Sequence, residues 1–190
     1  EYVHKPGTEI EEVQASMFYQ LAAIKAERAW KTSKGEGVVI AVIDSGVNYN
    51  HESLSPNILT NDGEIPNNGV DDDNNGLVDD YIGYDFVYND SRPYDDQGHG
   101  THVAGLSSSY HFGVAPRSKI LPLKAMSSFG TGDLGAISAA IYYAVDRGAD
   151  IINLSLSHEG EPQPFLSLAI KYAEKHNVVI VAAAGNGDDK

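Results

Sequence analysis

Two short segments of the sequence carry residue types that suit acid–base chemistry. Asp44 directly follows the apolar run 38–43, and the segment 96–105 contains His99 and His102, with a glycine on each side of His99. A carboxylate beside an imidazole can fix its tautomer and stabilise its charged form, as a general base requires. Two histidines three residues apart could instead bind zinc, but no third ligand of the HExxH type is present. Asp44 taken alone would also fit a loop cap.

The elements that must position these residues follow from apolar periodicity. Four runs predict strands buried on both faces, as in a parallel sheet: residues 38–43, 119–125, 149–156 and 178–183. Helical spacing predicts helices over residues 15–30, 133–147 (with Asp133 as N-cap) and 164–176, and a further helix that begins near His99. Strands that alternate with helices form a parallel sheet through right-handed crossovers, so the fold class is α/β. Ligands bind such sheets at the carboxyl ends of strands, where Asp44 and Asn186 both fall.

These segments resemble the subtilisin-like serine protease family (subtilases). Five motifs stand in the family's order, at family-like separations, from about residue 17 onward: Asp44-Ser-Gly46, His99-Gly-Thr-His-Val-Ala-Gly105, Gly113-Val-Ala-Pro116, Asn153-Leu-Ser-Leu156 and Ala184-Gly-Asn186. The resemblance implies a three-layer, doubly wound, mostly parallel sheet with helices on both faces, incomplete in this chain. It also implies that residues 1–16 are a lead-in and residues 17–190 the amino-terminal part of a catalytic domain.

The resemblance gives each polar residue a role. Asp44 would hold the imidazole in its correct tautomer, and His99 would act as general base and then as general acid. Asn186 would donate its side-chain amide to the tetrahedral oxyanion. His102, one helical turn after His99, is expected to be structural and to lie on a packed face.

The resemblance also implies a cleft for an extended polypeptide substrate. Two backbone segments would flank the substrate and pair with it as added strands: Gly130, Thr131 and Gly132 on one side, and Ser155, Leu156 and Ser157 on the other. Such recognition rests on main-chain hydrogen bonds, so affinity need not depend on the substrate's sequence. Ser157 departs from many relatives, which have glycine there.

The nucleophilic serine of the family is not among these residues. Subtilases carry it in a Gly-Thr-Ser-Met-Ala-type motif after the oxyanion Asn, and no serine here has such flanks. We expect a serine endopeptidase whose serine comes from a separate carboxyl-terminal chain, so that this chain alone is inactive. The alternative is a non-catalytic, calcium-stabilised peptide-binding domain or an inactive truncation. A propeptide is a further candidate partner.

Acidic residues concentrate in a window next to the histidine motif. Residues 61–96 contain eleven carboxylates and one arginine, a net charge of −10 out of −14 for the whole chain. Such crowding is costly unless a cation relieves it. The EF-hand pattern is matched at its opening, but Ile82 replaces the final Glu, so we predict a looped calcium site of another kind rather than a solvated acidic turn. Its expected ligands are Asp71, Asp73, Asn75, Asp79 and Asp80.

Two further acids, Asp95 and Asp96, lie just before His99. They could complete the calcium site, or they could raise the pKa of His99 as nearby negative charge. The sequence leaves both interpretations open.

Composition excludes several classes of function. The chain of 190 residues has a net charge of −14, which disfavours a nucleic-acid partner, and no apolar run approaches the roughly 20 residues that span a membrane. The absence of cysteine excludes a disulfide scaffold, a thiolate zinc site and a cysteine nucleophile. A dinucleotide-binding loop is excluded because Gly35-Glu-Gly37 precedes the first strand instead of following it. A calcium loop and an acidic surface together favour a secreted protein.

Overall fold

The chain forms two compact units, residues 1–34 and 35–190. The computed structural model describes residues 19–158, 160, 161 and 163–186. In the first unit these include two short helices, α2 (Tyr19–Ala23) and α3 (Ala26–Ala29). The single helix predicted over 15–30 is therefore wrong in its described part, because Lys25 adopts a left-handed conformation with φ of 57° between the two helices. The predicted lead-in over residues 1–16 lies outside the described residues.

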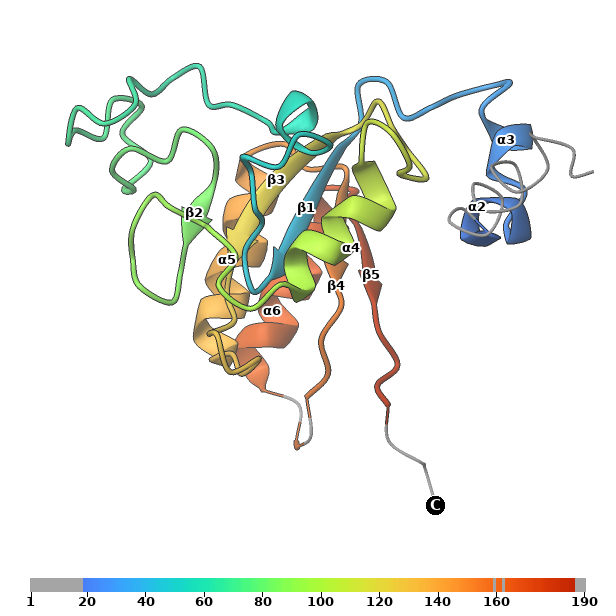
Figure 1. Cartoon of the computed structure of the whole chain (residues 1–190). Coiled ribbons are helices and arrows are strands. Elements are labelled where there is room, and N and C mark those ends of the chain that lie inside the picture. The colour runs from blue at the N-terminus through green and yellow to red at the C-terminus, as the bar shows by residue number, and fades with distance from the viewer. Residues whose placement is uncertain (1–18, 159, 162, 187–190) are drawn as a thin grey trace, which may run out of the picture. The chain divides into compact units, whose positions relative to one another are not determined.

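The second unit is built on a five-stranded parallel sheet (Figure 1). The strands run in the order β2 (Tyr84–Asp85), β3 (Lys119–Lys124), β1 (Val39–Asp44), β4 (Ile151–Leu154) and β5 (Val179–Ala182). The four predicted strands are confirmed: β1 begins and ends one residue later than the apolar run 38–43, and β3, β4 and β5 are shorter than their runs by one to four residues. Only the two-residue β2 lacks a sequence signal, since two residues are too few to show a period.

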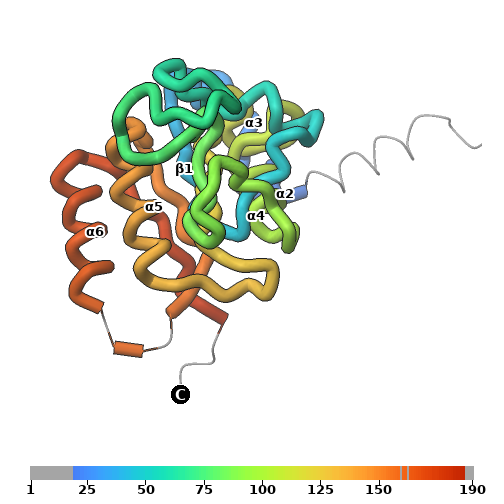
Figure 2. Tube along the Cα trace, turned by 90° about the vertical axis from the view of Figure 1, so that its left-hand side faces the viewer, coloured from blue at the N-terminus to red at the C-terminus, as the bar shows by residue number. Residues whose placement is uncertain are grey.

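Helices cover both faces of this sheet. Helix α4 (His99–Ser108) packs against β1 and β3 on one face, whereas α5 (Leu134–Asp146) and α6 (Pro164–Lys175) pack on the other. In Figure 2, α5 and α6 lie on one side of β1 and α4 on the other. The predicted three-layer α/β fold is confirmed. A 3-10 turn, η1 (Ser55–Asn57), follows β1.

Strand β1 is the centre of the core because both of its faces are covered. Ile40 and Val42 belong to the apolar cluster on the α4 side, while Ala41 and Ile43 belong to the cluster under α5 and α6. This alternation is the period of two that a strand imposes. It explains why the run 38–43 is apolar throughout.

Strand β5 departs from the predicted burial on both faces. Ile180 packs against the α5–α6 core, but Val179 and Val181 are 57% and 52% exposed. β5 is an edge strand, and no helix among the described residues covers the α4 side of it. The apolar run predicts the strand correctly, whereas its burial depends on a covering layer that a local pattern does not reveal. No helix in the described ranges is long and apolar enough to cross a membrane.

Candidate active site

Asp44 lies at a switch point of the sheet. It is the last residue of β1, whose neighbours are β3 and β4. After β1 the chain forms β2 and then enters β3 through α4 on one face, and it passes from β3 to β4 through α5 on the opposite face. The connections diverge there, and open α/β sheets form their binding crevice at such a point. Because side chains alternate along a strand, Asp44 faces the same side as Val42, toward α4.

His99 begins α4 and meets Asp44 at this point. The ring atom His99 Nδ1 lies 2.8 Å from Asp44 Oδ1. The Asp44 carboxylate is fully buried, while the His99 side chain is 47% exposed. A buried carboxylate on Nδ1 leaves Nε2 as the nitrogen available for proton transfer. The structure thus brings together two of the three residues for which the sequence predicts a catalytic role.

Gly100 allows α4 to approach the end of β1 this closely. A Cβ atom at Gly100 would clash with the carbonyl oxygen of Gly46 and would lie 3.0 Å from Asp44 Cβ. Any side chain there would force α4, and His99 with it, away from Asp44. The glycine after His99 is therefore a requirement of packing.

Asp95 holds the first turn of α4. Its carboxylate accepts hydrogen bonds from the amides of Gln97, Gly98 and Thr101 and from the hydroxyls of Ser45 and Thr101. Burial acts to raise the pKa of Asp95, but the hydrogen bonds, led by that from Thr101, outweigh burial and lower the pKa below its ordinary value. Ionised Asp95 therefore fixes the loop that delivers His99.

Lys124, at the end of β3, lies buried under the same loop with a side chain only 1% exposed. Its Nζ donates to Asp96 Oδ1 at 2.6 Å and to the carbonyl oxygens of Ser45 and Met126 at 2.7 and 3.0 Å. All three ammonium protons therefore have acceptors. Neither Asp95 nor Asp96 is among the three carboxylates that converge in the acidic window; both instead hold the loop before α4.

Both predicted substrate-binding segments line one cavity of about 230 Å³. Gly130, Thr131 and Gly132 lie on one side of it, and Leu156 and Ser157 lie on another. Its lining is completed by Met126, Leu134, Ile137 and His158. Ser155 does not line the cavity, and its hydroxyl accepts a hydrogen bond from Asn153 Nδ2 at 2.8 Å.

Asn186 and His102 are both exposed, and this contradicts only the position predicted for His102. Asn186 lies four residues beyond β5 and is exposed, so its amide is open to a bound group. The prediction that His102 lies on a packed face is wrong, because His102 is exposed. Helix α4 buries Gly100 and Ala104 against the sheet, and His102 and Leu106 occupy the opposite face.

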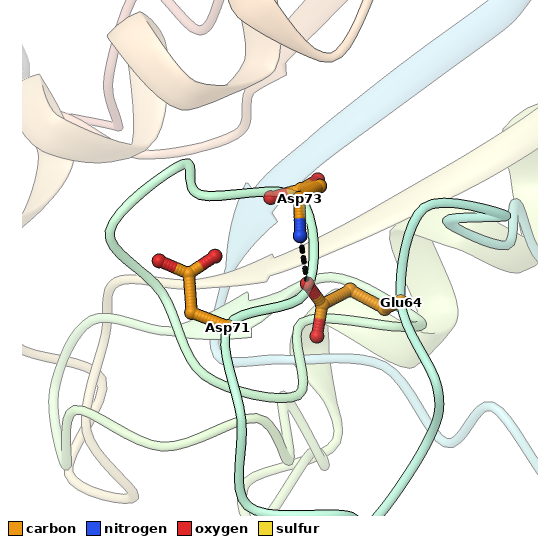
Figure 3. Close-up of side chains that lie close together, drawn as sticks. All are labelled: Glu64, Asp71 and Asp73. Carbon is orange, nitrogen blue, oxygen red and sulfur yellow. Dashed lines mark hydrogen bonds between the residues drawn. The ribbon is translucent and has the colours of Figure 1, made fainter.

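The acidic window folds into a loop in which three carboxylates converge (Figure 3). Glu64, Asp71 and Asp73 each offer an oxygen within 4.8 Å of the others. Glu64 is only 4% exposed; its Oε1 accepts the amides of Asp72 and Asp73, while its Oε2 is buried with no hydrogen-bond partner among the described residues. A buried carboxylate oxygen without a donor is the chemistry of a cation ligand.

The other three predicted ligands are used differently. Asp79 accepts the backbone amides of Asn68 and Gly69, so it closes a turn. Asp80 is fully buried and accepts a hydrogen bond from the Tyr143 hydroxyl on α5. Asn75 donates its side-chain amide to Asp73 and Asp80. The structure thus brings Asp71 and Asp73 into the cluster and leaves Asp79 and Asp80 outside it, while Asn75 contacts the cluster through Asp73.

Three residues of the two sites escape sequence reasoning. Glu64 stands seven residues before the calcium-like motif, and Lys124 and Tyr143 stand in a strand and a helix whose patterns only predict a core. For Lys124 the sequence does contain one signal, because a lysine at the carboxyl end of a buried strand needs hydrogen-bond acceptors nearby. Burial, with a further contribution from the hydrogen bond to Asp80, raises the pKa of the Tyr143 hydroxyl, so it remains a donor at neutral pH.

Comparison with known proteins gives a consistent result. The profile of the subtilase family matches residues 35–190, which is the whole second unit. The structure is similar to the crystal structure of a cold adapted subtilisin-like serine proteinase, with a TM-score of 0.64 at 30% identity over 82% of this chain and 49% of that one.

Several curated proteins are similar in sequence. A thermophilic serine proteinase of Bacillus sp. (strain AK1) is 40% identical over 83% of this chain and 35% of its own length. Thermitase of Thermoactinomyces vulgaris is 34% identical over 90% of this chain and 56% of its own length. Subtilisin-like protease 1 of Plasmodium berghei (strain Anka) is 37% identical over 85% of this chain and 28% of its own length. The chain therefore spans between about a quarter and just over half of each of these relatives.

Proposed function

Because the chain belongs to the subtilase family of serine proteases, we propose that it supplies the Asp and His of a serine endopeptidase. The observation that carries the proposal is the 2.8 Å contact between His99 Nδ1 and the buried carboxylate of Asp44. The nucleophilic serine comes from a carboxyl-terminal polypeptide outside these 190 residues. The chain alone is accordingly inactive toward peptide bonds.

The proposed chemistry follows from this contact. Asp44 keeps the proton of His99 on Nδ1, so Nε2 takes the proton of the serine hydroxyl as the serine oxygen bonds to the peptide carbonyl carbon. The amide of Asn186 donates to the oxyanion that forms. His99 then gives the proton to the departing amine as the carbon–nitrogen bond breaks, and water later releases the acyl group by the same route in reverse.

An extended polypeptide is the proposed substrate. Its backbone would lie between residues 130–132 and 155–157; the first segment, with Leu156 and Ser157 of the second, lines the 230 Å³ cavity. Leu134, Ile137 and Leu156 give that cavity apolar walls, so it would accept an apolar substrate side chain.

Calcium is the proposed cation of the acidic loop. Glu64, Asp71 and Asp73 offer hard oxygen ligands, and the donor-free Oε2 of Glu64 is the observation that fits a cation. When bound, calcium would neutralise the crowded carboxylates and hold the loop. We also propose an extracellular location, which the negative charge of residues 61–96 and the proposed calcium site both favour.

A labelling experiment tests the protease. In the complex of this chain with the serine-bearing polypeptide, a serine-directed fluorophosphonate should label the enzyme. Asp44→Asn should lower peptide hydrolysis by the complex about 10⁴-fold, because the imidazole loses its tautomer control. Asp146→Asn, an exposed aspartate away from His99, serves as the matched control and should leave the rate unchanged. No labelling together with retained peptide binding would overturn the protease and support a non-catalytic peptide-binding domain.

A titration tests the calcium site. Calcium should raise the melting temperature, and Glu64→Gln should weaken calcium binding by at least about tenfold. Asp62→Asn is the control, because Asp62 belongs to the same loop but lies outside the cluster. Equal calcium affinity in Glu64→Gln and the unaltered protein would contradict the assignment of Glu64.

A further inference from the structure

A tyrosine of the helical core reaches the acidic loop. Tyr143 lies in α5 with 8% exposure, and its hydroxyl donates to Asp80 Oδ2 at 2.5 Å across 63 residues of sequence. Asp80 is fully buried. Since α5 packs on the sheet, this hydrogen bond fixes Asp80 relative to the core.

Asp80 in turn holds two side-chain amides. Its Oδ1 accepts from Asn61 Nδ2 at 3.1 Å, and its Oδ2 accepts from Asn75 Nδ2 at 2.9 Å. Each of these amides also donates to Asp73 Oδ2, at 2.9 Å from Asn61 and 3.1 Å from Asn75. Each amide nitrogen carries two protons, so it can bridge both carboxylates at once.

Asp73 is thereby oriented from the side of the core. Its Oδ2 receives both amides, and its Oδ1 receives the backbone amide of Asn75 at 3.0 Å. Such contacts fix the rotation of a carboxylate before any cation arrives. Partners of this kind, one bond removed from a metal, commonly change metal affinity by about 10–100-fold when they are lost.

We propose that Tyr143 is a positioning residue for the cation site of the acidic loop, acting through Asp80, Asn61 and Asn75 on Asp73. The proposal rests on the calcium site proposed above. It gives Asp80 the role of an anchor between loop and helix, in place of the ligand role that the sequence motif predicts. It also makes α5 part of the cation site, although α5 supplies none of the three carboxylates.

Calcium titration by calorimetry of the purified protein tests the proposal. Tyr143→Phe keeps the ring in the core and removes only the donor to Asp80, and we expect the dissociation constant for calcium to rise at least about tenfold. Tyr142→Phe is the matched control, because the neighbouring Tyr142 is partly exposed and its ring packs against Tyr172 instead. Circular dichroism in EDTA checks that each variant is folded before calcium is added.

The outcomes separate the two proposals. Calcium binding by the unaltered protein with an unchanged dissociation constant in Tyr143→Phe would overturn the role of Tyr143 and leave the calcium site standing. Failure of the unaltered protein to bind calcium would overturn both. If Tyr143→Phe does not fold, Asp80→Asn serves as a second variant, because it keeps Tyr143 in place. Weakened calcium binding by Asp80→Asn would support the anchoring role of Asp80, and unchanged binding would contradict it.

Discussion

At the scale of residues, the contact between Asp44 and His99 depends on side chains that do no chemistry themselves. Asp95 ties the first turn of α4 to Ser45, and Lys124 ties Asp96 to the carbonyl of the same Ser45. Both attachments end on the residue that follows Asp44. The position of His99 relative to Asp44 is therefore set from two directions, by a buried anion and by a buried cation.

Loss of the buried cation should weaken the fold measurably. Lys124→Met keeps the aliphatic length of the side chain but leaves Asp96 and two carbonyl oxygens without their donor. We expect the free energy of unfolding to fall by about 2–4 kcal/mol, measured by urea denaturation. Lys119→Met is the control, since Lys119 is an exposed lysine of the same strand. Equal stability of Lys124→Met and the unaltered protein would show that the ammonium group is not needed.

Asp95 should make stability depend on pH in the acid range. Its pKa is lowered in the folded state, so ionised Asp95 stabilises the fold at pH values above the unfolded pKa of about 3.9. That stabilisation is lost as the pH falls through the lower folded pKa. When unfolding is measured at pH values from 6 downward, Asp95→Asn, which is less stable at neutral pH, should lose less stability than the unaltered protein. Parallel curves for Asp95→Asn and the unaltered protein would contradict this.

At the scale of elements, α5 connects the two sites. Its first turn contributes Leu134 and Ile137 to the substrate cavity, and its last turns contribute Tyr143 to the acidic loop. The helix begins where the sequence predicts, because the Asp133 side chain accepts the amides of Gly135 and Ala136. It ends before Gly148, whose φ of 74° suits a glycine.

Removal of the N-cap tests the start of this helix. Asp133→Ala leaves two amides of the first turn without an acceptor, and we expect a loss of about 1 kcal/mol in the free energy of unfolding. Asp133→Asn should retain most of that stability, because asparagine is a comparable N-cap. Thermal melts of the two variants measure the difference, and an equal loss in both would indicate a role of the charge in place of the cap.

Strands and helices that are long enough to show an apolar pattern are predicted well from the sequence. The layers that pack against them are not. The apolar runs that form β1, β3 and β4 and the apolar face of α5 predict the parallel sheet and its switch point. The position of Asp44 follows from that switch point. The burial of β5 and the exposure of His102 depend on neighbouring layers, which local spacing does not contain. Glu64 is similar: it joins Asp71 and Asp73 only through the tertiary path of the loop.

At the scale of the whole molecule, the described residues leave one side of the sheet incompletely covered. On the α4 side, Ile151 of β4 is half-buried, and Val179 and Val181 of β5 are more than half exposed. Leu106 on the outer face of α4 is 40% exposed. An apolar face beside an edge strand favours association with another polypeptide, both by burying apolar area and by adding a strand.

We propose that this face receives the carboxyl-terminal polypeptide that carries the serine. Val179→Lys with Val181→Lys should abolish its association with this chain, because two buried ammonium groups would lack partners. Leu168→Lys on α6 is the matched control: Leu168 is 58% exposed, but it lies on the opposite layer, and association should persist. Gel filtration of the two polypeptides expressed together measures the complex. Without its partner, this chain should elute as larger assemblies, and a stable, folded monomer of 20.4 kDa would contradict the need for a covering layer.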